Sequence, residues 1–230
     1  MDKILILIPA REGSKGILNK NTKIFNGKPL IEWTIKTALE SKLADRIVVS
    51  SDSKKILNLT KKFNIDCLKR PKSLSGDRSS TESVVKHCIK KYNNFYDIII
   101  LLPPTSPVRT KNILDDAIRF FKSNKLDSCF SGSKLNDFLI WSYNKTNKKY
   151  YSLNYDYKKR GNRQSRTPTY VENGSFYIFK SNLLLEEDNR IGRKLDIYKM
   201  KFYESFELDE KEDWKLIETI HKNYILENNK

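Results

Sequence analysis

Cysteine and histidine are scarce in this chain, whose 230 residues contain three cysteines and two histidines. No Cys-x-x-C pair occurs, the three cysteines (Cys67, Cys88 and Cys129) are widely spaced, and neither His87 nor His221 belongs to a metal-binding motif. This pattern argues against a zinc site and against a catalytic thiol. We therefore expect the cysteines to be small buried apolar residues.

Long apolar runs are also lacking. A membrane-spanning helix needs roughly 18 or more apolar residues, and the run Ile4–Ile8 is far too short. The N-terminus reaches this run almost at once, which leaves no room for a signal peptide. We expect a cytoplasmic protein without a membrane partner.

Acidic residues are few relative to basic ones, with 28 Asp and Glu against 44 Lys and Arg and a formal charge of +16. The lysines are spread along the whole chain in pairs, which is typical of solvated faces. A basic field attracts nucleic acid or a small polyanionic substrate, so charge alone does not choose between them. The lysines and tyrosines of Lys148–Arg160 fit a nucleic-acid platform as well as a partner-facing lobe.

Strand and helix patterns alternate along the chain. Strands are expected at Ile4–Ile8, Arg46–Ser50, Ile65–Leu68, Ile98–Leu102 and Gly174–Phe179, and helices at Leu30–Leu39, after Asp52-Ser53, from Ser80, at Asn112–Phe121 and from about Glu210. Such alternation predicts one α/β domain over residues 1–230, with a mostly parallel sheet and helices on both of its faces. Ligands bind such sheets beyond the carboxyl ends of the strands.

The pattern changes between residues 134 and 170, a segment rich in Asn, Lys and Tyr. It indicates short antiparallel strands more than a βα unit. We expect an inserted lobe here that makes a subunit contact and contributes to the site.

A small basic loop follows the first strand. Arg11, Lys15 and Lys20 bring three cations to one strand end, and Gly13 and Gly16 keep the backbone open. A triphosphate is held by such a bidentate Arg, point-charge lysines and unhindered N–H donors. The spacing excludes a P-loop and a dinucleotide fingerprint. The alternative to a phosphate-binding loop is an ordinary basic surface loop without a ligand.

The residues of this loop resemble a known family. Ile8-Pro-Ala-Arg-Glu-Gly-Ser-Lys-Gly-Ile17, followed by Lys20-Asn21, is similar to the opening of the acylneuraminate cytidylyltransferases, the CMP-sialic acid synthetases. Further motifs of that family follow in order: Gly27–Thr34, Arg70-Pro71, Leu74–Asp77 with Ser79–Thr81, Leu101–Arg109, Arg163-Gln164, Glu172–Tyr177 and Glu207–Asp209. Each motif alone has modest specificity for the family. Together they cover nearly the whole chain and are highly specific.

The resemblance implies a Rossmann-like nucleotidyltransferase fold and a reaction. Enzymes of this family transfer CMP from CTP to the anomeric hydroxyl of a nine-carbon 2-keto sugar acid, release pyrophosphate and use Mg²⁺. It implies CTP and an acidic sugar as substrates, a homodimer built by the lobe, and no nucleic-acid partner.

The resemblance also implies roles for single residues. Catalytic roles fall to Arg11, Lys15 and Lys20. Contacts with CTP fall to Arg11, Ser14, Lys15, Lys20, Asn21, Arg70, Ser79 and Thr81. Contacts with the sugar acid fall to Ser106, Arg163, Gln164, Asn173 and Tyr177, and Mg²⁺ binding to Asp209 and Glu207.

The metal pair can also be judged from its spacing. Glu207 and Asp209 alternate, so both project from one face if the segment is extended. Mg²⁺ prefers such hard oxygen ligands and keeps several waters. The alternative is that these acids, with Asp213, cap the last helix. The spacing does not decide between the two, and the resemblance favours the metal.

Two residues depart from the family pattern. Glu207 stands where the family usually carries Asp, and Pro103 stands where a Gln would contact the sugar. Proline offers no side-chain hydrogen bond, so legionaminic, pseudaminic or another nonulosonic acid fits as well as N-acetylneuraminate.

Two other functions stay open. The first is activation of 3-deoxy-octulosonate, although Ser14–Asn21 follows the sialate pattern rather than the Arg-Leu-Pro-Gly-Lys of those enzymes. The second is a basic nucleic-acid-binding protein, which would not require the carboxylate pair.

Overall fold

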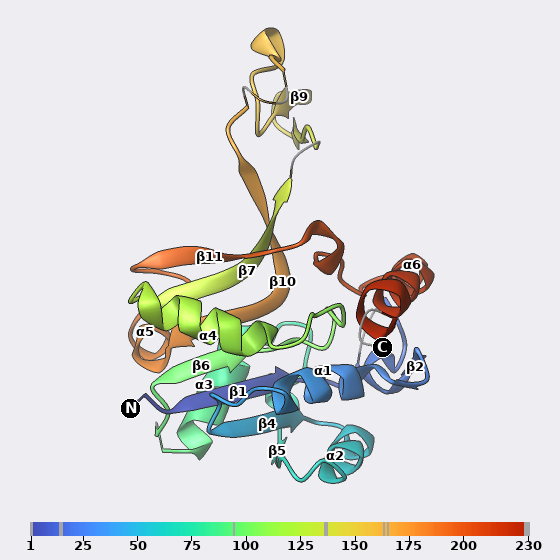
Figure 1. The fold of residues 1–230 in the computed structure, drawn as a ribbon, viewed down its shortest axis with the longest axis vertical. Coiled ribbons are helices and arrows are strands. Elements are labelled where there is room, and N and C mark those ends of the chain that lie inside the picture. Colours follow the sequence, from blue (N-terminus) through green and yellow to red (C-terminus); the bar gives the residue numbers. More distant parts are fainter. Residues whose placement is uncertain are drawn as a thin grey trace.

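The computed structural model describes residues 2–13, 16–93, 95–135, 138–162, 164 and 166–227. Its strands are β1 (Ile4–Pro9), β2 (Ile24–Phe25), β3 (Lys28–Pro29), β4 (Arg46–Ser51), β5 (Asp66–Lys69), β6 (Ile98–Leu101), β7 (Ser128–Leu135), β8 (Trp141–Asn144), β9 (Lys149–Ser152), β10 (Thr169–Lys180) and β11 (Leu195–Met200). Its α-helices are α1 (Leu30–Leu39), α2 (Lys54–Lys61), α3 (Thr81–Lys91), α4 (Ile113–Ser123), α5 (Ser181–Glu187) and α6 (Lys211–His221) (Figure 1).

The main sheet has seven strands in the order β11-β7-β10-β6-β1-β4-β5. β10 runs antiparallel to both of its neighbours, whereas the other neighbouring pairs are parallel. The prediction of a mostly parallel sheet is therefore confirmed. β1 lies in the centre, between β4 and β6, which explains its unbroken apolar run.

Alternate side chains of β1 enter two different cores. Ile4, Ile6 and Ile8 pack with apolar residues of α1, α2 and α4. Leu5 and Leu7 pack on the other face, with residues of α3 and α5. Helices thus cover both faces of the sheet, as predicted.

The second half of the sheet departs from the sequence-based prediction. β7 and β11 were not expected, and β10 begins at Thr169 rather than at Gly174. Apolar periodicity does not mark β7, because it buries serines whose hydroxyls form hydrogen bonds. Ser133, for example, donates to the carbonyl of Met200 in the neighbouring strand (3.1 Å). A second correction concerns Cys67, which is exposed on the edge strand β5, whereas Cys88 and Cys129 are buried as expected.

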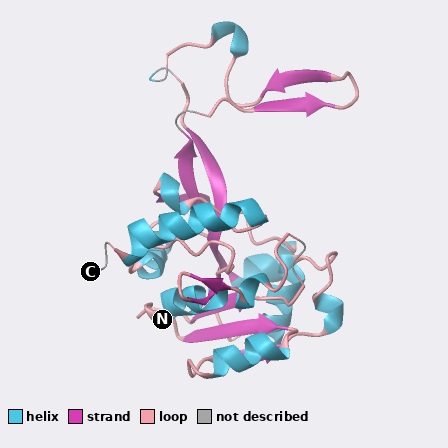
Figure 2. Cartoon of the chain, turned by 90° about the vertical axis from the view of Figure 1, so that its right-hand side faces the viewer, coloured by secondary structure: helices cyan, strands magenta, loops and turns pink. Residues whose placement is uncertain are grey.

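β7 and β10 continue past the sheet into a long projection (Figures 1 and 2). We call this projection, whose described residues lie between 138 and 168, the arm. It carries the antiparallel pair β8 and β9, which confirms the predicted change of pattern. Its surface holds exposed large apolar side chains: Phe138, Trp141, Tyr143, Tyr150, Tyr151, Leu153 and Tyr157.

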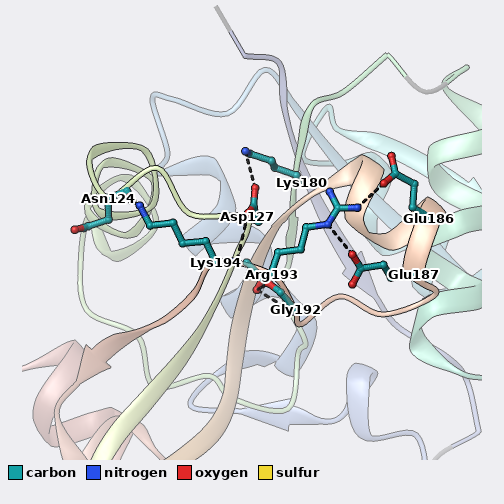
Figure 3. Close-up of polar contacts among 9 residues, drawn as sticks. Asn124, Asp127, Lys180, Glu186, Glu187, Gly192, Arg193 and Lys194 are labelled. Carbon is teal, nitrogen blue, oxygen red and sulfur yellow. Dashed lines mark hydrogen bonds and ion pairs between the residues drawn. The ribbon is translucent and has the colours of Figure 1, made fainter.

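A network of charges fixes the opposite end of the sheet, at the amino ends of the parallel strands. Asp127 accepts from Lys180 Nζ (2.7 Å), and Lys194 Nζ donates to the carbonyl of Asn124 (2.6 Å) (Figure 3). Nearby, Arg193 pairs with two carboxylates of α5 (Figure 3). Several basic side chains are thus committed to structural ion pairs. Among the described residues, no helix has the length and apolar character needed to cross a membrane.

The buried His221 predicts how stability responds to acid. Its ring lies among Phe25 and Trp33, its Nδ1 is 3.1 Å from Asn26 Nδ2, and burial lowers its pKa to about 4. An unfolded histidine binds a proton near pH 6.5, so the unfolded chain takes up this proton first as the pH falls. Stability from this group is complete above pH 6.5 and is lost down to about pH 4.

We expect the wild-type chain to lose about 3 kcal/mol more stability than His221→Gln between pH 7 and pH 4. Glutamine cannot titrate but still accepts a hydrogen bond from Asn26. Urea unfolding of both proteins at each pH measures the difference. Equal losses would show that His221 does not stay neutral in the folded chain.

Candidate active site

A cavity of about 510 Å³ opens at the carboxyl ends of β1 and β6. This is the edge at which parallel sheets bind ligands. Its walls come from the ends of both strands, from the loop after β1, from the N-terminus of α3 and from the segment before α6. The lining residues are Pro9, Arg11, Gly16, Lys20, Asn21, Arg70, Leu74, Gly76, Asp77, Ser79, Ser80, Thr81, Val84, Pro103, Pro104, Thr105, Asp209 and Glu210.

The loop after β1 is pressed against the segment that carries Asp209. A Cβ at Gly16 would lie 1.9 Å from the backbone oxygen of Asp209, so only glycine fits there. Lys20 is almost fully buried, and its ammonium donates to the carbonyl of Leu208 and to Asp209 Oδ1 (3.0 Å). One cation and one carboxylate from opposite ends of the sequence therefore meet at the cavity.

Two arginines add positive charge to the cavity. Arg11 donates to Asp77 Oδ1 (2.8 Å), and the amide of Asn21 holds the carbonyl of Arg11 (2.9 Å). Arg70 is buried and donates from Nη2 to the carbonyl of Ser50 (2.9 Å), while its Nε has no partner in the described chain. Burial, and the nearby Arg11, lower the pKa of Arg70. Its buried charge favours an anion as ligand.

The N-terminus of α3 faces the same space. Ser80 caps this helix by accepting from the backbone N–H of Ser83 (3.1 Å), and Thr81 is its first residue. The hydroxyl of Ser79 donates to the carbonyl of Ser73 (3.1 Å). A helix N-terminus offers N–H donors and a positive dipole end, which adds to the cations on the other wall.

The two acids of the predicted metal site differ in their surroundings. Asp209 is exposed and lines the cavity, whereas Glu207 lies behind it, half-buried, 3.5 Å from the hydroxyl of Thr105. Burial raises the pKa of Glu207, and the charge of Asp209 raises it further. The Glu207 carboxylate lies against the left-handed Gly174 (φ +61°), where a Cβ would be 2.1 Å from its Oε1.

This donor set fits Mg²⁺. Two repelling carboxylates favour a cation between them, and Mg²⁺ needs only one or two such ligands beside phosphate oxygens. Among the residues that the structure describes, no group of three or more His, Cys, Asp or Glu side chains could hold a metal ion. The capping role falls largely to Asp213, which accepts from the backbone N–H groups of Asp209 and Glu210 (3.0 and 2.7 Å).

Arg109 is a residue that sequence reasoning left without a role. It is buried, and its guanidinium donates to the carbonyls of Pro103 (2.7 Å) and Ser175 and to the hydroxyls of Ser175 (3.0 Å) and Thr34 (3.3 Å). Burial lowers its pKa, and the Glu207 carboxylate partly offsets this. Its place at the end of the motif Leu101–Arg109 is the sequence signal that marked it.

Two residues predicted to face the sugar form hydrogen bonds within the protein. Asn173 is buried; its Oδ1 accepts from the hydroxyl of Ser131 (2.7 Å), and its Nδ2 lies 3.4 Å from the sulfur of Met200. The phenol of Tyr177 donates to Glu172 (2.6 Å). Neither side chain lines the cavity, and their contacts with the sugar stay predictions.

The other residues predicted to contact the sugar lie in different parts of the molecule. Ser106 is buried beside the cavity wall, and its hydroxyl has no partner in the described chain. Gln164 is on the arm and lines a different cavity, of about 430 Å³, at the base of the arm. Ser14, Lys15 and Arg163 lie outside the described residues.

Comparisons with known proteins agree with this geometry. The family model described as cytidylyltransferase matches residues 5–230. The chain is 30% identical to the N-acylneuraminate cytidylyltransferase of Escherichia coli over 96% of its own length, but spans only 52% of that relative. It is 36% identical to a pseudaminic acid cytidylyltransferase of Campylobacter jejuni, covering 81% of this chain and 82% of the relative.

A solved structure shares the fold. It is described as a CMP:2-keto-3-deoxy-manno-octonic acid synthetase complexed with CTP, and it matches 97% of this chain and 100% of its own with a TM-score of 0.71. Sequence identity to it is 14%, so the likeness concerns the fold alone.

Proposed function

The chain belongs to the cytidylyltransferase family, and from that premise we propose that it transfers CMP from CTP to the anomeric hydroxyl of a nine-carbon 2-keto sugar acid. The relatives named above, an N-acylneuraminate and a pseudaminic acid cytidylyltransferase, support this class of acceptor. The chain spans only about half of the N-acylneuraminate cytidylyltransferase. The proposal therefore concerns the activity of this chain and not that of the whole relative.

The observation that carries the proposal is the charge pattern of the cavity. Arg11, Lys20 and Arg70 converge on it with the N-terminus of α3, and Asp209 stands at its edge. Cations and N–H donors at one strand end suit a triphosphate, and a carboxylate beside them suits the metal ion that accompanies it.

The reaction is an in-line displacement. The anomeric oxygen forms a bond to the α-phosphorus of CTP, the bond to the β-phosphate bridging oxygen breaks, pyrophosphate leaves, and the hydroxyl proton passes to solvent or a nearby base. No covalent enzyme intermediate is needed, so catalysis rests on positioning and charge neutralisation. Arg11 and Lys20 neutralise charge on the phosphates.

Asp209, with Glu207 behind it, would hold Mg²⁺. When bound, the ion withdraws charge from the phosphate oxygens. Lys20 keeps Asp209 in place through its ammonium, and Thr105 contacts the carboxylate of Glu207.

Pro103 leaves the acceptor open. It lines the cavity, and its carbonyl is already engaged by Arg109, so this position supplies only an apolar ring. An acceptor with an apolar substituent at this point would lose no hydrogen bond when proline replaces glutamine.

The test is pyrophosphate release from CTP and Mg²⁺ with a panel of acceptors: N-acetylneuraminic, legionaminic, pseudaminic and 3-deoxy-octulosonic acid. We expect turnover with at least one nine-carbon acid and little with the eight-carbon acid. Turnover with the eight-carbon acid alone would move the chain to the other acceptor class. No turnover with any acid, together with salt-dependent retention on nucleic acid, would overturn the proposal.

We propose further that the chain works as a homodimer in which the arm completes the sugar side of the site. Gln164 lies on the arm and away from the cavity that holds Asp209, so it meets a sugar there only if a second copy supplies it. The exposed aromatic residues of the arm suit such an interface. Light scattering gives the mass, and mixing Gln164→Ala with Asp209→Asn should recover part of the turnover that each lacks.

A further inference from the structure

A chain of contacts outside the cavity ties together two of its walls. It begins at Arg190, in the segment between α5 and β11. The guanidinium of Arg190 forms an ion pair with Glu82 and lies over the ring of Tyr177, 4.3 Å from its centroid. The side chains of Arg190 and Glu82 are 21% and 17% exposed, so water screens this pair only partly.

The first end of this chain of contacts is the N-terminus of α3. Glu82 is in the first turn of that helix, directly after Ser80 and Thr81, which line the cavity. A second ion pair, between Lys86 of α3 and Asp188 (2.6 Å), joins the same two segments. The segment around Arg190 therefore holds the N-terminal part of this helix in place.

The second end is a bulge in β10. Glu172 pairs with Gly132 and Tyr177 pairs with Phe130, so five residues of β10 advance where β7 advances only two. The phenol of Tyr177 donates to Glu172 (2.6 Å), which closes the bulge across its two ends.

The residues inside the bulge serve the active site. Gly174 forms the seat of the Glu207 carboxylate, with no room for a Cβ, and Ser175 accepts two hydrogen bonds from Arg109. A change in the shape of the bulge would therefore move Glu207, because the contact with Gly174 leaves no slack.

We propose that Arg190 is a positioning residue: it fixes the N-terminus of α3 through Glu82 and the bulge beneath Glu207 through Tyr177, and so holds the nucleotide wall and the metal wall of the cavity in register. This role rests on the proposed function, because it concerns the binding of CTP and Mg²⁺ in that cavity. Arg190 itself does not line the cavity.

The kinetic test separates the contact of Arg190 with Glu82 from its contact with Tyr177. Arg190→Gln should lower kcat about tenfold and raise both KM for CTP and the Mg²⁺ concentration for half-maximal activity. Glu82→Gln should raise KM for CTP alone, and Tyr177→Phe should raise the Mg²⁺ requirement alone. Arg190→Lys keeps the positive charge and should restore part of the loss.

Arg193→Gln is the matched control. Arg193 lies three residues further on and also pairs with two carboxylates, Glu186 and Glu187 (Figure 3). None of these three residues lines the cavity. This variant should leave all three kinetic parameters unchanged. An equal effect of both variants would reduce Arg190 to a general stabiliser and overturn the proposal.

Hydrogen exchange gives a readout that does not need turnover. In Arg190→Gln, the amides of residues 172–177 and of the first turn of α3 should exchange faster than in the wild-type chain, while those of β1 should not. Unchanged exchange at both places would overturn the proposal. If the wild-type chain releases no pyrophosphate, the proposed function fails, and the exchange pattern still decides whether Arg190 holds the two walls.

Discussion

Asp209→Asn is expected to lower Mg²⁺-dependent turnover about a thousandfold while leaving the fold intact. The variant keeps the size of the side chain and removes its charge. Asp209 is exposed at the edge of the cavity, so little packing is lost, but the metal would lose its carboxylate on the cavity side. Steady-state pyrophosphate release measures turnover, and Mn²⁺ titration in the presence of CTP measures binding of the ion.

Glu212→Gln is the control for this change. Glu212 is exposed in the first turn of α6 and does not line the cavity, so its loss should leave turnover unchanged. If Asp209→Asn retained full turnover at ordinary Mg²⁺ concentrations, the metal assignment would be wrong. If both variants lost activity equally, the charge of the whole segment would matter rather than one ligand.

Arg109→Met is expected to cost about 3–5 kcal/mol of folding free energy. Methionine fills similar space but donates no hydrogen bond, so the part-buried carbonyl of Pro103 and the buried carbonyl of Ser175 would lose the donor that Arg109 now provides. The Glu207 carboxylate would also lose a neighbouring cation, and its pKa would rise further. Urea unfolding at pH 7 measures the loss.

Arg119→Met provides the comparison. Arg119 is 61% exposed on α4, and its close ion pair (2.9 Å) is with the exposed Asp116, whereas the buried Asp115 is 4.0 Å away. An exposed ion pair of this kind contributes at most about 1 kcal/mol. A loss of similar size in both variants would mean that the network around Arg109 adds no more than a surface ion pair.

The sequence predicted the first half of the fold because its signals are local. The central strands are buried on both faces and are continuous apolar runs, and the helix at Leu30–Leu39 begins and ends as its periodicity indicates. β7 lacked such a signal, since its buried serines are satisfied by neighbouring strands that are distant in sequence. Its burial could be known only once those strands were paired.

In the candidate site, too, some residues could be predicted from local sequence and others could not. The cations that follow a strand, such as Arg11 and Lys20, could be predicted from their position in the chain, and the structure places both at the cavity. The inward turn of Asn173 could not, because it depends on the bulge in β10 and on Ser131 of the next strand. The close fit of Gly16 against Asp209 likewise joins residues whose proximity no local pattern encodes.

The way the arm leaves the sheet restricts how its length can change. It grows out of two neighbouring strands that stay paired beyond the bulge, as in the partners Val171 and Ser133 and the partners Thr169 and Leu135. Side chains alternate between the two sides of such a ribbon, so inserting one residue in each strand would turn the outer part of the arm over. Its reach can therefore be adjusted only in steps of two residues per strand, and a relative with a longer or shorter arm should differ from this chain by an even number in each strand.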